Sequence, residues 1–386
     1  MAFEVSSPTI RVEVEGQDIG FAATKAIIRC EVDLSRDLAD QIKLLVANPF
    51  SDDPYSGGPG EFAFIDSAAF EPGNRVDVYL GYANENEHVC SGIIAKWLPK
   101  FSGSGFPTLE IIARDASIRM MDGETSSEAR VFGSEGGSIT FSDIVRNILD
   151  SHDILPGKFD ETPERDGKVV KKAGMTDYQF VKGIANLHGF EFHVVWNTIL
   201  NTWDGNFRFP VSDQTETYDF VFGDGSARLL NFEPQWGLQN SPSAVKILYY
   251  DRETGTWEEL IEEGTKEGKS PKFTGGNSIT QPADSLSKLR VAADGKSVEI
   301  VGTRQFYNAE DAKRYAENWF AKRIRNFITA RGKVIGLPGL RPGDVHNILN
   351  IGTRMSGEWE FTNVRHVFTA QDGFVTNFAA NKVITS

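Results

Sequence analysis

A strict alternation of apolar and polar residues recurs along this chain and constrains its fold more than any other feature. Residues 10–14, 28–34 and 76–80 each alternate apolar with polar or charged side chains. A period of two is typical of half-buried β-strands. Turn residues such as Pro72-Gly73 separate the runs. The N-terminal part of the chain is therefore predicted to be β-structure.

The pattern changes to helical spacing at three places. Thr140 precedes a stripe of apolar residues at three- and four-residue steps, and Asn308 precedes a longer one. Between them, Thr176 and Gln179 have the spacing of a capping box, and Gly189 lies where a left-handed C-cap is expected. The sequence therefore predicts three helices, the second of which leads directly into an alternating strand.

Two distant segments share one order of features: a Pro-Gly turn, a strand, a glycine, a Ser-Gly pair and a long strand. Proline fixes φ and glycine tolerates positive φ, so each Pro-Gly suits a tight turn. The first segment contains Pro72, Gly73, Gly81, Ser91 and Gly92, and the second contains Pro342, Gly343, Gly352, Ser356 and Gly357. The match predicts that one β-barrel unit occurs twice, with the first two helices inserted between the copies.

The expected fold is thus a β-rich α+β protein, with two β-barrels, an inserted α+β domain and a helix packed on the second barrel. A strong Asp-Gly hairpin signal at Asp372-Gly373 closes the second barrel. Residues 49–60 are rich in proline and glycine and read as a loop. The predicted boundaries are 1–117 for barrel 1, 118–221 for the inserted domain, 222–260 with 298–386 for barrel 2, and 261–297 for an exposed insertion.

Composition excludes several classes of protein. The chain has 40 basic and 54 acidic residues and a formal net charge of −14, which argues against a protein that grips nucleic-acid phosphates. No run approaches the roughly 18 to 20 apolar residues of a membrane span, and the start lacks the apolar region of a secretory signal. Cys30 and Cys90 are too few for a disulfide framework.

We expect no catalytic, cofactor-binding or metal-binding residues. His188 and His193 are five residues apart across a predicted helix end, so polar surface or core is a simpler interpretation than a metal site. Asp344 and His346 lack a third ligand at a suitable spacing. Glu191 is the best candidate for a glycosidase carboxylate, but its alternation with apolar residues predicts a solvent-facing position.

A cationic cluster at the end of the third helix has two interpretations. Lys322, Arg323 and Arg325 complement the helix dipole. They also suit an electrostatic contact with an acidic neighbouring subunit or a spike protein. Both interpretations stay open.

Three stretches together resemble the hub proteins of phage tails, including the late-control-D hub and the hub portion of type VI secretion spikes. They are the run Phe70–Asp115, the segment 175–190 with its "TD-x-x-F … G-F" pattern, and the closing strands 336–378. The motif positions are Pro72, Gly73, Gly81, Gly92, Asp115, Thr176, Asp177, Phe180, Gly189, Phe190, Pro342, Gly343, Asp344, Ser356, Gly357, His366 and Gly373.

The resemblance implies a structural, non-enzymatic baseplate hub. Each subunit of such a homotrimer contributes two tail-tube-like barrels, so that three subunits match a hexameric tube on one side and a trimeric spike on the other. The implied partners are further copies of the chain, the spike, the tail tube protein, and wedge and tape-measure proteins, with DNA only as passing cargo. The implied place is the virion tail baseplate, assembled in the host cytoplasm, with no integral membrane association. The spike is expected to be a separate polypeptide.

Two other functions remain open from the sequence. One is a tail-associated cell-wall or polysaccharide hydrolase, which needs paired carboxylates in a groove. The other is a carbohydrate-binding receptor protein, which needs exposed tryptophan rings, and Trp203, Trp236 and Trp257 are the candidates.

Overall fold

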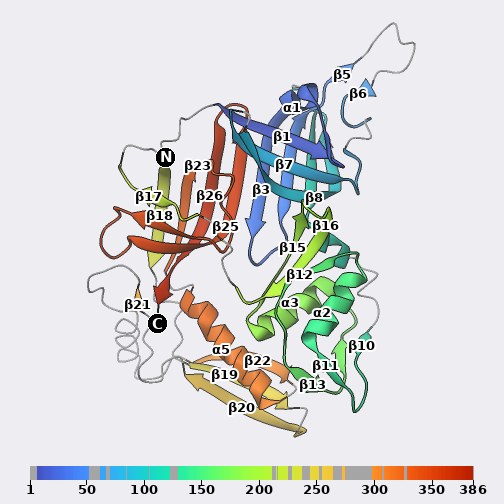
Figure 1. Cartoon of the computed structure of the whole chain (residues 1–386), viewed down its shortest axis with the longest axis vertical. Coiled ribbons are helices and arrows are strands. Elements are labelled where there is room, and N and C mark those ends of the chain that lie inside the picture. Colours follow the sequence, from blue (N-terminus) through green and yellow to red (C-terminus); the bar gives the residue numbers. More distant parts are fainter. Residues whose placement is uncertain are drawn as a thin grey trace.

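The computed structural model contains one large sheet with an α+β domain below it (Figure 1). The β-rich α+β class predicted from the sequence is confirmed. The structure describes residues 7–51, 61–66, 70–83, 85–103, 105–121, 129–210, 214, 216–224, 228–236, 244–251, 254–263, 272–273, 298–306, 308–325 and 328–385.

Thirteen strands form the large sheet, and their apolar faces enclose its core. Its main path runs β18-β23-β26-β25-β3-β4-β9-β8-β7-β1-β2, and β24 and β17 extend from β25. The strands are β1 (Pro8–Val14), β2 (Gln17–Asp18), β3 (Ile27–Ser35), β4 (Gln41–Ala47), β7 (Arg75–Tyr82), β8 (Glu85–Lys100), β9 (Thr108–Arg114), β17 (Asp219–Val221), β18 (Leu229–Trp236), β23 (Ile328–Ile335), β24 (Val345–Leu349), β25 (Gly357–Thr369) and β26 (Gly373–Lys382).

The same strand topology occurs twice in this sheet. In the first unit, β3 pairs with β4, the meander β7-β8-β9 follows, and β9 returns to pair with β4. In the second unit, β18 pairs with β23, the meander β24-β25-β26 follows, and β26 returns to pair with β23. The spatial orders β7-β8-β9-β4-β3 and β24-β25-β26-β23-β18 are therefore equivalent.

Backbone hydrogen bonds at the two Pro-Gly turns agree in detail. The Gly73 N–H donates to the Ile94 carbonyl at 2.8 Å, and the Ile94 N–H donates at 2.9 Å to the residue after the glycine. In the second unit Gly343 and Phe361 make the same two bonds, at 2.6 and 2.8 Å. Both glycines have positive φ, 100° and 93°. A β-bulge follows each paired residue, between Ile94 and Lys96 and between Phe361 and Asn363.

The Ser-Gly pairs that suggested the repeat are not equivalent to each other. Gly92 lies opposite Val76, the second residue of β7. Gly357 lies opposite Ile348, the fourth residue of β24. The residue equivalent to Gly92 is Trp359, because it lies opposite the second residue of β24. The repeat is thus a property of topology and register, and this part of the sequence match was a coincidence of composition.

The two units share one sheet and one core. Strand β3 of the first unit pairs antiparallel with the C-terminal half of β25, from Ser35 opposite Asn363 to Arg29 opposite Thr369. One hydrophobic cluster runs through both units, and Val32 and Val364, which flank the junction, are fully buried. The units are therefore joined as one body rather than by a linker.

The α+β domain follows β9 in the chain and has a separate core. The predicted caps are present: the Thr140 hydroxyl accepts the Asp143 N–H at 2.9 Å, Thr176 and Gln179 form a capping box, and Gly189 ends the second helix at φ 70°. Its elements are a 3-10 helix (Ala116–Met121), β10 (Arg130–Phe132), β11 (Ser138–Thr140), α2 (Phe141–Asp150), β12 (Leu155–Phe159), β13 (Glu164–Asp166), β14 (Val169–Lys171), α3 (Asp177–His188), β15 (Glu191–Asn197) and β16 (Thr202–Arg208).

The long helix α5 (Ala309–Arg325) lies on a small sheet of its own, and not on the strands of the second unit as the sequence suggested. That sheet consists of β19 (Ala244–Asp251), β20 (Thr256–Glu263) and β22 (Val298–Phe306). Ala312 and Ala316 of the helix are buried against Ile247 and Phe306. Helix α5 also contacts α3 of the inserted domain. Strands β19, β20 and β22 and helix α5 thus form a third layer, visible at the bottom of Figure 1.

The remaining elements are short. They are α1 (Phe21–Ala26), β5 (Phe50–Ser51), β6 (Glu61–Phe62), β21 (Lys272–Phe273) and β27 (Ile384–Thr385). The predicted loop 49–60 contains β5, and the predicted insertion 261–297 contains the end of β20 and all of β21. Residues 52–60, 264–271 and 274–297 lie outside the described residues. No helix in the described part of the chain has the length and apolar character needed to span a membrane.

Candidate interface site at the junction of the two units

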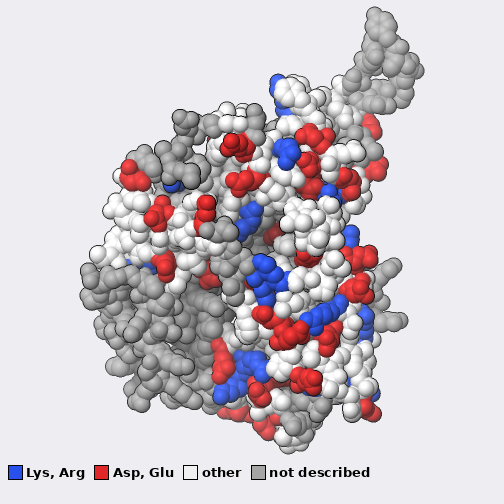
Figure 2. All heavy atoms as spheres, in the orientation of Figure 1, with Lys and Arg blue, Asp and Glu red and all other residues white. Residues whose placement is uncertain are grey.

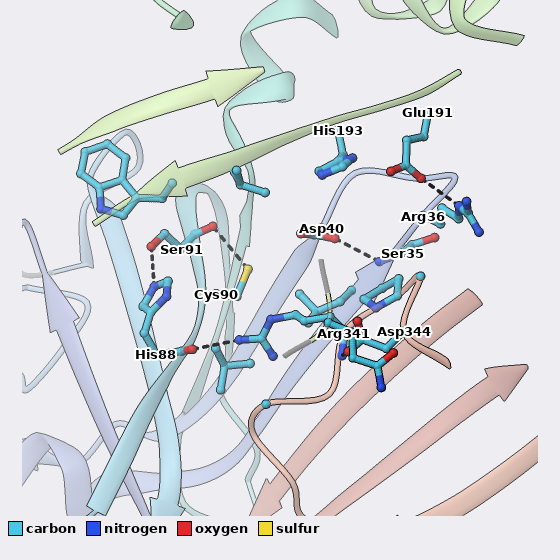
Figure 3. A pocket seen from close by; sticks show the side chains of 18 of the residues that line it. Ser35, Arg36, Asp40, His88, Cys90, Ser91, Glu191, His193, Arg341 and Asp344 are labelled. Atoms are coloured by element: carbon cyan, nitrogen blue, oxygen red, sulfur yellow. Dashed lines mark hydrogen bonds and ion pairs between the residues drawn. The ribbon is translucent and has the colours of Figure 1, made fainter. Parts of the chain in front are cut away.

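A cavity of about 590 Å³ lies where the two units meet the inserted domain (Figure 3). The end of β3 with Arg36 forms one side, and residues 87–91 of β8 form another. Strand β15 contributes Glu191 and His193, and the loop 339–344 of the second unit closes the cavity. Several predicted motif positions, among them Asp344, thus come together at this junction.

Arg36 connects all three parts of the chain. Its Nε lies 2.9 Å from Glu191 Oε2 of the inserted domain, and its Nη1 bonds to Glu360 of the second unit. Arg208 also approaches Glu191, at 3.8 Å. Burial alone would lower the pKa of Arg36, but the two carboxylates outweigh burial and raise that pKa above its ordinary value. The ion pairs therefore hold the three parts together.

Glu191 is consequently not the solvent-facing residue that its alternation predicted. Its side chain is 11% exposed and is neutralised by arginines. Burial nevertheless raises its pKa, and Arg36 only partly opposes that effect. The partners of Arg36 lie 155 and 324 residues away in the sequence, so no local pattern could reveal this cluster.

Arg341 is a second connection between the units. Its guanidinium donates to the carbonyls of Pro338, of Leu340 at 2.9 Å and, across the junction, of His88 at 3.0 Å. The Arg341 N–H donates to Asp344 Oδ2 at 3.0 Å, which fixes the turn that contains the Pro-Gly pair. Burial lowers the pKa of Arg341. The motif residues Pro342, Gly343 and Asp344 thus shape the loop that presents this arginine.

Two neighbouring aspartates lie at the cavity, and Asp40 is the one that lines it. The Asp40 N–H donates to Asp115 Oδ2 at 2.6 Å, and Asp115 also accepts the Ser117 N–H at 2.7 Å. Asp40 in turn accepts the Ser35 N–H at 3.0 Å. Burial and the charge of Asp115 raise the pKa of Asp40 to about 8. Asp40 is therefore largely protonated at neutral pH, while the motif residue Asp115 organises the turn that begins the 3-10 helix.

Ser91 and His88 belong to a hydrogen-bonded chain with the residue types of a catalytic triad. The hydrogen bonds connect these residues in a different sequence from that of a triad. The Ser91 hydroxyl donates to Asp77 Oδ1 at 2.5 Å, and His88 Nε2 lies 2.9 Å from Ser91 Oγ. The serine proton thus goes to the carboxylate, and the imidazole is left to donate to the serine. Burial lowers the pKa of His88. A serine nucleophile needs the histidine as its proton acceptor, whereas this serine donates its proton to the carboxylate.

In the inserted domain, the motif residue Asp177 is the centre of a buried charge cluster. Lys171 Nζ lies 2.6 Å from one carboxylate oxygen and His152 Nε2 lies 2.9 Å from the other. Burial would raise the pKa of Asp177, but hydrogen bonds from His152 and Lys171 hold it below its ordinary value. Sequence reasoning missed Lys171, which is 1% exposed, because its strand is only three residues long.

The motif histidine His366 is a core residue. It is fully buried, with Nδ1 3.0 Å from Thr376 Oγ1 and Nε2 3.3 Å from the Leu340 carbonyl. Burial lowers its pKa to about 3, so the ring is neutral. Its contact with Leu340 supports the loop that carries Arg341.

The other motif positions are structural and lie apart from the cavity. Gly81 has no room for a side chain, because a Cβ atom would lie 1.9 Å from the Glu85 carbonyl oxygen. Phe180 stacks on Phe132 with ring centroids 5.8 Å apart. The remaining positions lie in turns, caps, strands and the closing hairpin: Pro72, Gly73, Gly92, Thr176, Gly189, Phe190, Ser356, Gly357 and Gly373.

Other sequence candidates do not join the site. Lys322, Arg323 and Arg325 lie in the last turn of α5, and their side chains fall outside the described residues. His188 is buried against Phe141, at a ring distance of 5.3 Å. Among the described residues, no three His, Cys, Asp or Glu side chains are arranged to hold a metal ion. The three tryptophans differ: Trp203 is buried, Trp236 is half-buried, and Trp257 is 60% exposed.

Charge is interspersed on the face shown in Figure 2. Acidic and basic side chains alternate over the described part of this face without a continuous area of one sign. Charged side chains of the described residues are often paired, as Arg365 is with Glu31 at 2.9 Å and with Asp33 at 3.0 Å. The net negative charge of the chain is therefore not gathered into a patch on this face.

Solved structures with the same fold are tail proteins and secretion-system components. A tail protein from Neisseria meningitidis MC58 has 14% identity, covers 97% of this chain and 96% of its own, and has a TM-score of 0.63. The 43 kDa tail protein of prophage MuSo2 from Shewanella oneidensis has 14% identity, coverages of 97% and 98%, and a TM-score of 0.65. The Escherichia coli type VI secretion component c3393 has 12% identity, coverages of 97% and 77%, and a TM-score of 0.54. The chain thus has the fold of phage tail proteins.

The sequence itself identifies the family. The Alg8 N-terminal domain model matches residues 9–370, so the chain belongs to the Alg8 N-terminal domain family. No curated protein sequence matches it. The assignment to the late-control-D hub family from the motif positions was therefore wrong. The prediction that the chain is not an enzyme is corrected as well, because the family match contradicts it.

Proposed function

We propose that this chain is a structural hub of a phage tail or a phage-like injection machine, a homotrimer that joins a hexameric tail tube to a trimeric central spike and closes the tube before ejection. The observation that supports the proposal is the repeated topology, β7-β8-β9-β4-β3 and β24-β25-β26-β23-β18. Three copies of a chain with two equivalent units present six similar units to a neighbour. The likeness to tail proteins supports a tail protein fold, and the repeat supports this particular role.

The repeat explains how one protein can contact partners of different symmetry. The two strand units are equivalent in topology, so a ring of three chains has approximate sixfold symmetry at the strands. The inserted domain and α5 layer occur once per chain, so they keep threefold symmetry. We expect the tube protein to contact the first kind of surface and a spike to contact the second. Wedge and tape-measure proteins are further expected neighbours in the virion tail baseplate, which would assemble in the host cytoplasm.

Charge supports a passage for DNA rather than a DNA-binding site. Three copies carry a formal charge of −42, three times the −14 of one chain. A wall that repels phosphate lets a genome slide, because contacts with phosphates would hold it. We therefore expect acidic residues to face the channel of the assembled ring. A structure of the ring with a basic channel would remove this part of the proposal.

Co-assembly with purified partners tests the proposed function. The full chain is mixed with the tube protein and with the candidate spike protein of the same tail, and complexes are separated by size. We expect one trimer to bind one hexameric tube ring at one face and one spike trimer at the other. Binding of neither partner by a chain that is folded and trimeric would contradict the adaptor role.

Enzymatic activity is a separate property from assembly and needs its own test. Glu191 lines the cavity and has a pKa raised by burial, as a general acid would, although it is paired with Arg36. A zymogram on cell-wall material compares the wild type with a Glu191→Gln variant. Clearing that is lost in the variant, while its assembly is retained, would add a hydrolytic activity to the structural role.

A further inference from the structure

The junction between β3 and β25 shows how two units of this kind join. Residues 29–35 pair antiparallel with residues 363–369, and Arg365 bridges Glu31 and Asp33 on the face that is turned away from the core. Val32 and Val364 close the core beneath the junction. This internal junction therefore provides a template for joining the second unit of one chain to the first unit of another.

Register identifies the two edges that correspond to this junction. Asp33 of β3 and Gln235 of β18 occupy equivalent positions in the two units. Asp33 pairs with a residue of β4 and Gln235 pairs with a residue of β23, and these two partners lie opposite equivalent residues of β9 and β26. Asn363 and Lys96 also hold the same place, directly after the matching bulges. Strand β18 is thus the counterpart of β3, and residues 96–102 are the counterpart of 363–369.

Within the described residues, neither counterpart edge pairs with a second strand. Among the described strands, β18 pairs only with β23, and β8 beyond Ile93 pairs only with β9. Side chains that are buried at the internal junction are exposed at these edges: Phe368 is 9% exposed, whereas its counterpart Phe101 is 60% exposed. The two edges belong to the first and the eighth strand along the sheet, and these strands do not pair with each other in the described part of the chain.

We propose that β18 of one copy pairs antiparallel with residues 96–102 of a second copy, with Trp236 opposite Trp97 and Glu233 opposite Lys100. This interface rests on the proposed homotrimer and specifies how it closes. Three such junctions between chains alternate with three internal junctions around the ring.

The side chains that meet in this register are complementary. Glu233 and Lys100 are both exposed, have opposite charge and lie directly opposite each other. Phe101 lies opposite Phe232, and aromatic pairs stabilise neighbouring strands. The lysine and glutamate replace the arginine and acid pairs of the internal junction, so the charge match is kept with different residues.

Two prolines also coincide in this register. Pro99 lies opposite Pro234, at the place of His366 and Val32 in the internal junction. The Arg36 N–H donates to the Thr362 carbonyl at 3.3 Å. Hydrogen-bonded pairs between the two strands of the internal junction therefore occur at every second residue from Arg36, and the pair that corresponds to the two prolines is one of them. The missing N–H groups point to the open edges, and the ladders with β9 and β23 stay intact. In the proposed register the Pro99–Pro234 pair therefore forms no ladder hydrogen bond, and the pairs on either side of it carry the backbone contacts.

Disulfide cross-linking tests the register. Lys100 and Glu233 fall at a non-hydrogen-bonded pair, where opposite Cα atoms are about 4.5 Å apart, within the range of a disulfide. The variant Lys100→Cys/Glu233→Cys is oxidised mildly and compared with Lys100→Cys/Gln235→Cys, which shifts one cysteine by two residues. Cys30 and Cys90 are buried and leave both variants with the same background.

We expect the matched pair to form covalent trimers at least fivefold more efficiently than the shifted pair. A trimer that forms by mass but cross-links equally in both variants, or in neither, would overturn this interface and leave the proposed trimer intact. A chain that stays monomeric at every concentration, without cross-links, would contradict both. A ladder of products longer than three would support the pairing of the edges and contradict a closed trimer.

Discussion

At the scale of single residues, a few buried charges hold the three parts of the chain in place. Arg36 and Arg341 each contact groups from more than one part. Motif positions such as Asp115 and His366 serve turns and loops beside these arginines. The sequence marked several of these positions, but it gave no indication of their partners, because each partner lies far away in the chain.

Removal of Arg36 should destabilise the protein more than removal of an exposed arginine. Arg36→Ala leaves Glu191 and Glu360 without their shared cation, and we expect a loss of about 2 to 4 kcal/mol in the free energy of unfolding. The control is Arg146→Ala, whose pair with Glu161 is largely exposed and should change stability by less than about 1 kcal/mol. Urea unfolding of both variants measures the difference. Equal effects would show that the Arg36 cluster does not join the parts.

Asp40 should give stability an unusual dependence on pH. Its pKa is raised to about 8 in the folded chain, from an ordinary value near 3.9 in the unfolded chain. The folded state therefore holds one more proton between about pH 4 and pH 8, so this group's contribution falls as pH rises through that window. Asp40→Asn keeps the shape and removes the titration. The stability of the variant relative to the wild type should rise from pH 5 to pH 8, measured by thermal and urea unfolding, and a constant difference would contradict the assignment.

At the scale of elements, local patterns predicted the helices well because their ends carry their own chemistry. The Thr176 capping box, the Thr140 cap and the Gly189 C-cap are all present. The placement of α5 on β19, β20 and β22 could not be predicted, since an apolar helix face does not say which surface it covers. The pairing of β3 with β25 was equally hidden, because it joins segments more than 300 residues apart.

The capping box of α3 should contribute measurably to stability. Thr176→Ala removes the acceptor of the Gln179 N–H, and Thr176→Ser keeps it. We expect a loss of about 1 kcal/mol for alanine and little change for serine. Urea unfolding checks this, provided that the free energy of unfolding of both variants depends on urea concentration with the same slope. The same stability for alanine as for serine would show that the cap is not effective.

The proposed strand interface makes a prediction about charge. Lys100→Glu places two acids opposite each other across the interface, so the trimer should dissociate at concentrations about tenfold higher than the wild type does. The combined change Lys100→Glu/Glu233→Lys restores opposite charges and should recover most of the loss. Sedimentation velocity over a range of concentrations measures both. An effect of Lys100→Glu that the second change does not relieve would argue against the pairing.

At the scale of the whole molecule, the duplicated unit is the feature on which the account depends. The sequence predicted it from the shared order of a Pro-Gly turn, a strand, a glycine, a Ser-Gly pair and a long strand. In the structure the repeat consists of matching strand order, bulges and hydrogen bonds. The family assignment rests on a match that extends over residues 9–370, and it corrected the family that the motif positions suggested. Fold and family are therefore separate findings here, and the proposed assembly rests on the fold.

Electron microscopy of the purified full-length chain tests the central claim most directly. End-on averages should show a closed ring of six similar densities with threefold symmetry, built from three chains of 42.7 kDa each. Averages that show single particles of one chain, or a ring in which the two units of a chain occupy unlike places, would contradict the account.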